Sequence, residues 1–241
     1  MKLGIVGKRY EDTKLYIKSN QIGESNNCER LESCLGGMHN FRLTEVEDYN
    51  LAMIENGIKK AYIIEDSSTS TRTSYTYTTE PSIIDDLFID SLADISWIHF
   101  AYIDDLDDIT AIKNLTKPYS IDFCMNKDRR PYVEYMSNAS VVFDSRERKG
   151  LYKDIYIVTP IVLHDEKGCE VIVDGKVVCT HECETLENVS VNGAGDIYAK
   201  FFLETHFLRH YDVKSASKYA LESTTFYLKY FQNLGVVNEE V

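Results

Sequence analysis

The stretch Asn192-Gly193-Ala194-Gly195-Asp196 has the clearest chemical potential in the chain, and an amphipathic segment follows it directly. A turn of small residues at a helix N-terminus exposes backbone N–H groups. These groups and the helix dipole bind anions, most often phosphate. Gly193 and Gly195 let an anion approach the backbone because they carry no side chain. Asp196 falls in the first helical turn, where the dipole favours an ionised carboxylate, so it can accept a proton from a substrate hydroxyl.

A simpler interpretation of this stretch stays open. Asn192 can cap an ordinary helix while the two glycines only make the turn, because short glycine motifs recur by chance. The stretch alone therefore does not decide between phosphate binding and an ordinary helix start.

The surrounding elements alternate between strands and helices. Strands are predicted over 3–7, 59–64, 95–100, 119–123, 141–143 and 155–159. Helices are predicted over 45–56, 83–92, 104–114, 132–137, 194–210 and 214–231. Residues 169–173 and 176–180 flank Asp174-Gly175, which predicts a hairpin, and the Ser-, Thr- and Tyr-rich segment 67–79 predicts exposed strands. The alternation predicts one α/β domain over residues 1–241 with a mainly parallel sheet.

The composition limits the class of protein. The chain has 241 residues, and 26 Lys and Arg against 39 Asp and Glu give a net charge of −13. Such a negative field opposes binding to nucleic acids and anionic membranes, so neither is an expected partner. No apolar run approaches the roughly 20 residues of a membrane helix, and the start is too short and glycine-broken for a signal-peptide core. Six scattered Cys suit reduced thiols, and the cytoplasm is the expected location.

Two other clusters give weaker signals. The segment 179–183, Cys-Thr-His-Glu-Cys, suggests a metal site, but it lacks the second pair of ligands that would close a tetrahedron. The acidic run 104–108 lacks the glycine and the closing Glu of a calcium loop. It therefore indicates the acidic start of a helix.

Residues 190–196, Ser-Val-Asn-Gly-Ala-Gly-Asp, resemble the Asp-Thr-x-Gly-Ala-Gly-Asp signature of the ribokinase-like (PfkB) carbohydrate kinases. Four signature residues match in a row, after a predicted hairpin and near the C-terminus. The resemblance implies a three-layer α/β/α fold with a small β-flap near 67–79. It implies an ATP-dependent kinase that transfers the γ-phosphoryl group to a hydroxyl of a sugar or sugar-like small molecule. Gly193, Ala194 and Gly195 would form the anion hole and Asp196 would be the catalytic base.

Other positions follow the order of this family more weakly. Gly7 and Asp12 have the spacing of its early strand and sugar-binding Asp, and the segment from Gly36-Gly37 to Asn40 is similar to its substrate-contacting motif. Asp12, Gly36, Gly37 and Asn40 are therefore expected to bind the acceptor. Flaps of this family can pair between subunits, so the resemblance also allows a homodimer.

The resemblance also implies an ATP-binding site, which involves four further residues. The segment 144–147 stands where an Asn-x-x-Glu motif is expected, and Glu147 would help to organise Mg²⁺ and its water. The resemblance therefore assigns ATP binding to Asp144, Glu147, Thr159 and Gly168. The strand 120–123 is similar to the Asp-containing strand of the family.

The chain also departs from the family pattern. Ser190 and Val191 replace the Asp and Thr of the signature, Asp144 replaces the Asn, and Pro160 follows Thr159 where a glycine turn is usual. The chain is thus a shortened and divergent version. These departures leave open a second hypothesis, a nucleotide- or sugar-binding regulatory protein on the same fold.

Simpler alternatives also remain for four of the assigned positions. Asp12 can be a solvated helix-start residue, Gly36-Gly37 a plain turn, and Glu147 part of a solvated charged face.

Overall fold

The computed structural model describes residues 2–18, 28–43, 50–66, 71–184, 186 and 193–230. Its strands are β1 (Lys2–Ile17), β2 (Cys28–Gly37), β3 (Asn50–Asp66), β4 (Thr71–Glu80), β5 (Trp97–Phe100), β6 (Tyr119–Asp122), β7 (Val141–Ser145), β8 (Ile161–Asp165), β9 (Gly168–Val173) and β10 (Lys176–Glu182). Its α-helices are α1 (Asp86–Ser91), α2 (Val133–Asn138), α3 (Ala194–Leu203) and α4 (Val213–Tyr230). Short 3₁₀ helices are Met38–Leu43, Ile103–Asp105, Thr110–Asn114, Arg130–Tyr132 and Arg146–Tyr152, and a π-helical turn, Glu204–Leu208, extends α3.

The strands form a ten-stranded sheet in the order β10-β9-β8-β7-β6-β5-β1-β3-β4, with β2 also paired to β1. The strands β3, β1, β5, β6, β7 and β8 run parallel. The antiparallel strands are β2, β4, β9 and β10. The predicted α/β fold with a mainly parallel sheet is therefore confirmed, as is the hairpin around residues 174–175.

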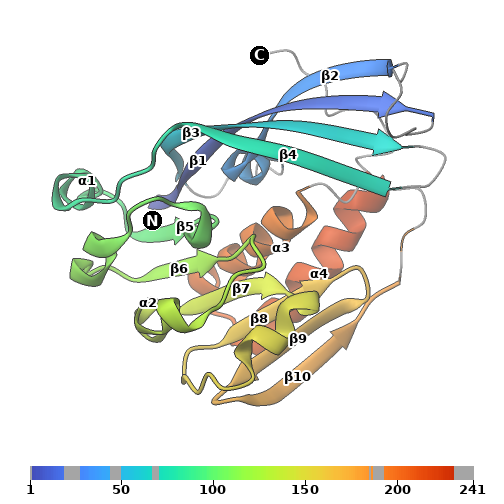
Figure 1. Ribbon diagram of the computed structural model, residues 1–241. Helices are drawn as coiled ribbons and strands as arrows, with labels where there is room; N and C mark the ends of the chain where they lie inside the picture. The colour runs from blue at the N-terminus through green and yellow to red at the C-terminus, as the bar shows by residue number, and fades with distance from the viewer. Residues whose placement is uncertain are drawn as a thin grey trace.

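Strand β1 takes part in two regions of the structure. Its residues Leu3–Val6 pair with β5, whereas its residues Arg9–Ile17 pair with β2. The second half of β3 pairs with β4 over residues 58–66. The outer halves of β1 and β3 together with β2 and β4 thus form a flap that projects beyond the rest of the sheet (Figure 1). The exposed strands expected within residues 67–79 are found as β4, while residues 67–70 lie outside the described part of the chain.

Different helices cover the two faces of the sheet. On one face, α3 and α4 pack against the strands, and the buried residues there include Leu3, Ile5, Phe143, Val162, Phe202 and Ala220. The 3₁₀ helix Met38–Leu43 packs on this same face, whereas α1, α2 and the other 3₁₀ segments lie on the opposite face. The buried residues of that second core include Val6, Phe100, Ile121, Tyr135, Met136 and Val142. Neighbouring residues of one strand point to opposite faces, so each inner strand supplies both cores. Among the described helices, none is long and apolar enough to cross a membrane.

The predicted helix over 45–56 is wrong for its described part. Residues 50–56 belong to β3, where they pair with the buried start of β1, and residues 45–49 lie outside the described chain. Gly57, which directly follows the predicted helix, lies inside β3 with φ of +87°. A Cβ there would lie 2.8 Å from the carbonyl oxygen of Glu80, so glycine permits the close approach of β3 and β4.

Two other predicted elements are also wrong. The segment 104–114 forms two separate 3₁₀ helices, because its acidic side chains bind neighbouring segments instead of one helical turn. The segment 155–159 is not a strand, although Ile155 and Ile157 are buried and mimic strand alternation. The strand β8 begins only at Ile161, after Pro160, which cannot donate a ladder hydrogen bond.

A buried ionic cluster around Arg129 fixes the segment that follows β6. The Arg129 side chain is fully buried, and its Nε and Nη2 lie 3.0 and 2.9 Å from Oδ2 of Asp144. Its Nη1 lies 3.0 Å from Oδ2 of Asp104, and its Nη2 donates to the carbonyl oxygen of Met125 at 2.7 Å. Asp104 in turn accepts from the backbone N–H of Cys124. Residues 124–129 are therefore held in one conformation.

We predict that Arg129→Met lowers the free energy of unfolding by about 3–5 kcal/mol, because two buried carboxylates lose their cation. Urea unfolding followed by circular dichroism measures this change. Arg130→Met is the matched control: Arg130 is exposed and pairs with Asp128, so a change within about 0.5 kcal/mol is expected. Equal effects of the two substitutions would contradict the structural importance of the cluster.

Candidate active site

The carboxyl ends of the parallel strands meet at one edge of the sheet. Tyr102 follows β5, Cys124 follows β6 and Glu147 follows β7, while Asp165 ends β8. In open parallel sheets, ligands bind outside the carboxyl ends of the strands. The topology alone therefore places the candidate site at this edge, against the N-terminus of α3.

Asp196 lies at the N-terminus of α3 and is 3% exposed. Its Oδ2 accepts a hydrogen bond from Nδ2 of Asn40 at 2.8 Å. The Tyr102 hydroxyl lies 2.7 Å from Oδ1 and 2.8 Å from Oδ2. The base predicted from the sequence is thus held by one predicted residue, Asn40, and by one residue that the sequence analysis missed, Tyr102.

The turn before Asp196 requires glycine. Gly193 has φ of +78°, a left-handed conformation that side chains other than glycine rarely adopt. A Cβ at Gly193 would lie 2.8 Å from Cγ of Asn40, and one at Gly195 would lie 3.0 Å from Cε1 of His164. The absence of side chains therefore lets this turn pack closely between the 3₁₀ helix Met38–Leu43 and β8. The motif residues 190–192 lie outside the described chain.

A cleft of about 520 Å³ lies between the flap and this edge of the sheet. The flap contributes every second residue of its strands, which places their side chains on one face. These lining residues are Tyr10, Asp12, Lys59, Ala61, Ile63, Ser74 and Thr76. Gly37, at the end of β2, also lines the cleft, and the body contributes Asn40, Tyr102, Cys124, Met125 and Gly193. The cleft thus has hydroxyl, amide and carboxylate groups beside aromatic and aliphatic ones.

The acceptor residues predicted from the sequence come together in this cleft. Asp12, Gly37 and Asn40 line it, and a Cβ at Gly36 would lie 2.3 Å from Oδ2 of Asp12. Asp12 belongs to β1 and pairs with Cys34 of β2, so it does not start a helix. Gly36 and Gly37 end β2 where it crosses from the flap to the body.

The acidic run 104–108 ties the flap to the body. Nζ of Lys59 lies 2.6 Å from Oδ1 of Asp105, and the Tyr10 hydroxyl also donates to Asp105. Nζ of Lys8 lies 2.9 Å from Oδ2 of Asp107. The expected acidic helix start is found only as the short 3₁₀ helix Ile103–Asp105, and the carboxylates of Asp105 and Asp107 bind lysines of β3 and β1.

The nucleotide-side residues predicted from the sequence are more scattered. The Asp144 carboxylate accepts hydrogen bonds from Arg129, Arg148 and Tyr152, whereas Glu147 is exposed. The Thr159 hydroxyl lies 3.2 Å from the carbonyl oxygen of Ala139, ahead of the amino end of β8. This position is at the opposite end of β8 from His164 and the Gly195 turn, so the structure does not bring Thr159 to the site.

Gly168 begins β9 with φ of +142°, and a Cβ there would lie 2.0 Å from the carbonyl oxygen of His181. Glycine at position 168 therefore permits the close approach of β10 to the start of β9. Among the described residues, no group of three or more His, Cys, Asp and Glu could hold a metal ion.

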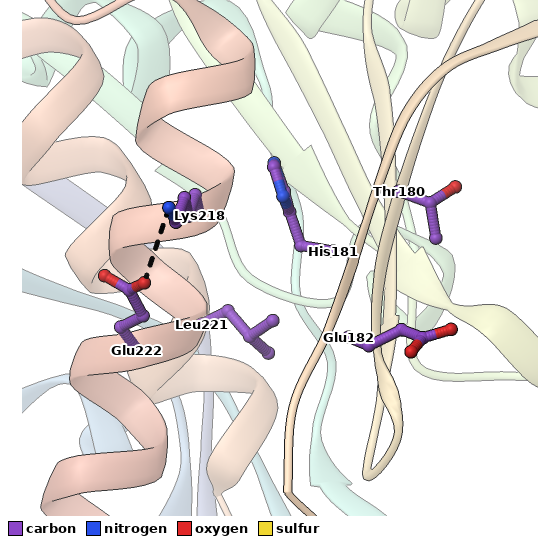
Figure 2. Close-up of a pocket in the computed structure, with 6 residues that line it drawn as sticks. All are labelled: Thr180, His181, Glu182, Lys218, Leu221 and Glu222. Carbon is purple, nitrogen blue, oxygen red and sulfur yellow. Dashed lines mark ion pairs between the residues drawn. The ribbon is translucent and has the colours of Figure 1, made fainter.

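A second, more open cleft of about 420 Å³ lies between β10 and α4. Figure 2 shows His181 of the strand and Leu221 of the helix both lying between β10 and α4, with the Lys218–Glu222 ion pair on the helix. Nε2 of His181 and the carbonyl oxygen of Lys214 lie 3.1 Å apart. On its strand side this cleft is lined by Thr180, His181 and Glu182, which belong to the segment 179–183 considered above as a metal site. None of the residues assigned to the acceptor or to ATP lines it.

Comparisons with known proteins give a consistent picture of the fold. No family model matches the sequence, and no curated protein matches it. Solved structures match over nearly the whole chain. Ribokinase from Thermotoga maritima has a TM-score of 0.70 and 11% identity, covering 95% of this chain and 93% of its own. Ribokinase from Arabidopsis thaliana, complexed with ribose and ATP, has a TM-score of 0.67 and 11% identity over 95% and 93%. A nucleoside kinase from Methanocaldococcus jannaschii has a TM-score of 0.64 and 13% identity over 95% and 92%.

The chain has the ribokinase-like fold. The resemblance stated from residues 190–196 is thereby confirmed at the level of the fold. Identities of 11–13% are too low to carry over an activity or a substrate.

The cleft residues that the sequence analysis missed include three with polar contacts between parts of the site, Tyr10, Lys59 and Tyr102. Tyr102 carried a usable signal, because it follows a predicted strand at the edge where such sheets bind ligands. Tyr10 and Lys59 carried none, since their approach to Asp105 depends on how the flap folds over the body.

The environment of Asp196 changes its ionisation. Burial raises the pKa of Asp196 to about 6, and the hydrogen bonds from Tyr102 and Asn40 oppose this rise. A carboxyl with this pKa is ionised at neutral pH yet is a stronger base than a solvated carboxylate. Burial also raises the pKa of the neighbouring Asp122 well above its ordinary value, together with the charges of Asp196 and Asp144.

We predict that Asp196→Asn stabilises the fold at neutral pH. A folded pKa near 6 lies above the unfolded value, so the native state loses stability as pH rises from about 4 to 6. Asparagine removes this penalty, and about 1.4 kcal/mol per pKa unit gives a gain of up to about 3 kcal/mol above pH 6 and none below pH 4. Urea unfolding at a series of pH values measures it.

Asp212→Asn is the control, because its expected change in the free energy of unfolding has the opposite sign. Hydrogen bonds from Ser215 lower the pKa of Asp212, so its loss should reduce stability above pH 4. A gain for Asp196→Asn that is independent of pH would contradict the assignment of a raised pKa to the native carboxyl.

Proposed function

We propose that this protein is an ATP-dependent kinase that phosphorylates a hydroxyl of a sugar or sugar-like small molecule. One observation carries the proposal: the buried Asp196 carboxylate lies beside a cleft that also holds Asp12 and Asn40, in the first turn of a helix behind a glycine turn. This arrangement combines a base, hydroxyl-binding groups and a place for an anion, which are the parts that phosphoryl transfer needs. Ribokinases and a nucleoside kinase with the same fold support the reaction class.

In the proposed reaction, Asp196 accepts the proton of the attacking hydroxyl. Its pKa of about 6 keeps Asp196 ionised at neutral pH, and because this pKa lies near the working pH the carboxylate is an effective base. Asp12 and Asn40 orient the acceptor by hydrogen bonds to its other hydroxyls. Tyr10 and Met125 offer apolar surface to the carbon framework of the acceptor.

The backbone N–H groups of Gly193, Ala194 and Gly195 are proposed to stabilise the transferring phosphoryl group. The helix dipole of α3 adds to this stabilisation, and a chain with a net charge of −13 has few other sources of positive potential. The glycines are needed because any side chain would meet Asn40 or His164.

The donor nucleotide is proposed to extend from this turn toward the cleft between β10 and α4. His164, Cys169 and His181 lie in register on β8, β9 and β10. Strand spacing therefore puts His181 about 10 Å from His164, which contacts Gly195. That separation suits a nucleotide whose phosphates lie at the glycine turn and whose base lies beside α4.

Magnesium is proposed to be held mainly by phosphate oxygens and water, with Glu147 as the nearby acidic side chain. Asp144 is a poor ligand, because its oxygens already accept from Arg129, Arg148 and Tyr152. A bound magnesium ion would neutralise charge on the transferred group. Gly168 is proposed to shape the turn beside the donor.

A second candidate function is a nucleotide- or sugar-binding regulatory protein. The observation that favours it is the engagement of Asp144 in the buried Arg129 cluster, at the position where a kinase of this type has Asn. An intact Asp196 favours the enzyme, because binding alone does not need a buried base.

We predict that Asp196→Asn lowers ADP formation at least 100-fold while leaving nucleotide binding intact, because only proton transfer is lost. The measurement is ADP release with ATP, magnesium and a panel of sugars, amino sugars and nucleosides. In the unaltered protein, kcat/KM should fall tenfold per pH unit below about pH 6.

Gly150→Ala is the matched control, because a Cβ at this exposed position meets nothing within 4 Å. Thermal stabilisation by ATP without ADP formation from any acceptor would favour the regulatory protein. Equal ADP formation by the unaltered protein and Asp196→Asn would contradict the assigned base.

We further propose that the outer face of the flap forms a homodimer. The apolar residues on this face, opposite the cleft, are Leu31, Leu35, Tyr62, Tyr75 and Tyr77, and each is at least 39% exposed. Strand pairing places them together, since Tyr62 is opposite Tyr75 in β4 and Leu35 opposite Glu11 in β1. Exposed apolar patches of this kind mark interaction surfaces.

We predict a dimer in analytical ultracentrifugation that the double substitution Tyr62→Glu and Tyr75→Glu converts to a monomer, because buried charges oppose association. Leu87→Glu is the control, since Leu87 is 79% exposed but lies in α1, away from the flap. A monomeric unaltered protein at micromolar concentration would contradict this proposal and leave the kinase proposal untouched.

A further inference from the structure

Tyr102 makes an unusual contact with the proposed base. Its hydroxyl lies within hydrogen-bond distance of both oxygens of Asp196, at 2.7 and 2.8 Å, whereas Asn40 reaches only Oδ2. A single hydroxyl proton can therefore be given to either oxygen. When an acceptor hydroxyl donates to one oxygen, Tyr102 can keep its bond to the other.

The backbone holds this hydroxyl in place. Tyr102 has φ of +62° and ψ of +57°, a left-handed conformation that is rare for an aromatic residue. The N–H of Ala101 donates to the carbonyl oxygen of Val6, and the N–H of Asp105 donates to that of Tyr102. The Tyr102 ring lies 5.8 Å from the ring of Tyr10 in the flap. Strained residues held by their surroundings in this way are concentrated at functional sites.

On the basis of the function proposed above, we propose that Tyr102 is a positioning residue that keeps the Asp196 carboxylate ionised and oriented toward the acceptor hydroxyl. A hydroxyl that donates to a carboxylate stabilises its ionised form. Burial raises the pKa of Tyr102 itself, so this hydroxyl keeps its proton and remains a donor throughout the working pH range. The hydrogen bond from Tyr102 thus lowers the pKa of Asp196, whereas burial raises it.

Other titratable groups face Asp196 from neighbouring elements. Burial raises the pKa of Asp122 in β6 and of Cys124 beyond it, so the Cys124 thiol keeps its proton. Burial lowers the pKa of His164 in β8 to about 4, which leaves it neutral near pH 6. Asp12 faces the same cleft from β1. Asp122 is a second buried carboxyl whose pKa is raised by burial, so the test includes Asp122→Asn.

The experiment compares the pH dependence of kcat/KM in the unaltered protein, Tyr102→Phe and Tyr10→Phe. Tyr10→Phe removes a hydroxyl of the same cleft that donates to Asp105 and not to Asp196. We expect Tyr102→Phe to move the acid limb upward by about one pH unit, so that kcat/KM falls about fivefold at pH 6, about tenfold well below pH 6 and hardly at all at pH 9. Tyr10→Phe should leave the midpoint of the limb in place, and so should Asp122→Asn.

A carbon NMR titration of the Asp196 carboxyl gives a second readout that needs no activity. Its midpoint should lie near pH 6 in the unaltered protein, shift upward in Tyr102→Phe and stay unchanged in Tyr10→Phe. A midpoint that Tyr102→Phe does not move, or a loss of kcat/KM that is uniform across pH, would overturn the role of Tyr102. Absence of kinase activity with a shifted midpoint would refute only the proposed function.

Discussion

The burial of one carboxylate, that of Asp196, constrains the organisation of the candidate site. A carboxyl group removed from water needs hydrogen-bond donors to ionise, and Tyr102 and Asn40 supply them. Each donor comes from a different part of the fold: Asn40 from the 3₁₀ helix after β2, and Tyr102 from the end of β5. The site can therefore form only when the flap strands, the central sheet and α3 have assembled.

The length of β1 links these parts. Its first half is a buried central strand, whereas its second half turns outward into the flap and places Tyr10 and Asp12 over the sheet edge. Lys59 on β3 holds the flap against the body through its ion pair with Asp105, and both side chains of this pair are buried. Separating the flap from the body would leave a buried charge without its partner, which costs free energy, so this ion pair fixes the position of the flap. The same flap exposes its outer face, which we propose as the dimer surface.

The sequence predicts much of this structure where local chemistry decides it. The glycine turn before Asp196, the hairpin at 174–175 and the alternation of central elements all follow from short-range patterns. The segments 50–56 and 104–114 were mispredicted because long-range contacts override their local preference: pairing with β1 for the first, and ion pairs with Lys8 and Lys59 for the second. Within the site, Asp12, Gly37 and Asn40 were predicted by resemblance and share one cleft, whereas Tyr10, Lys59 and Tyr102 depend on tertiary geometry. Thr159 lies before the amino end of β8, away from the Gly195 turn, because this strand begins only after Pro160.

The central claim is that Asp196 activates a hydroxyl for phosphoryl transfer. Mass spectrometry of a small-molecule extract incubated with the protein, ATP and magnesium tests it most directly, since it requires no prior choice of acceptor. The account predicts a compound that becomes heavier by one phosphoryl group with the unaltered protein and not with Asp196→Asn. Formation of the same product by both proteins, or of none by either, would contradict it.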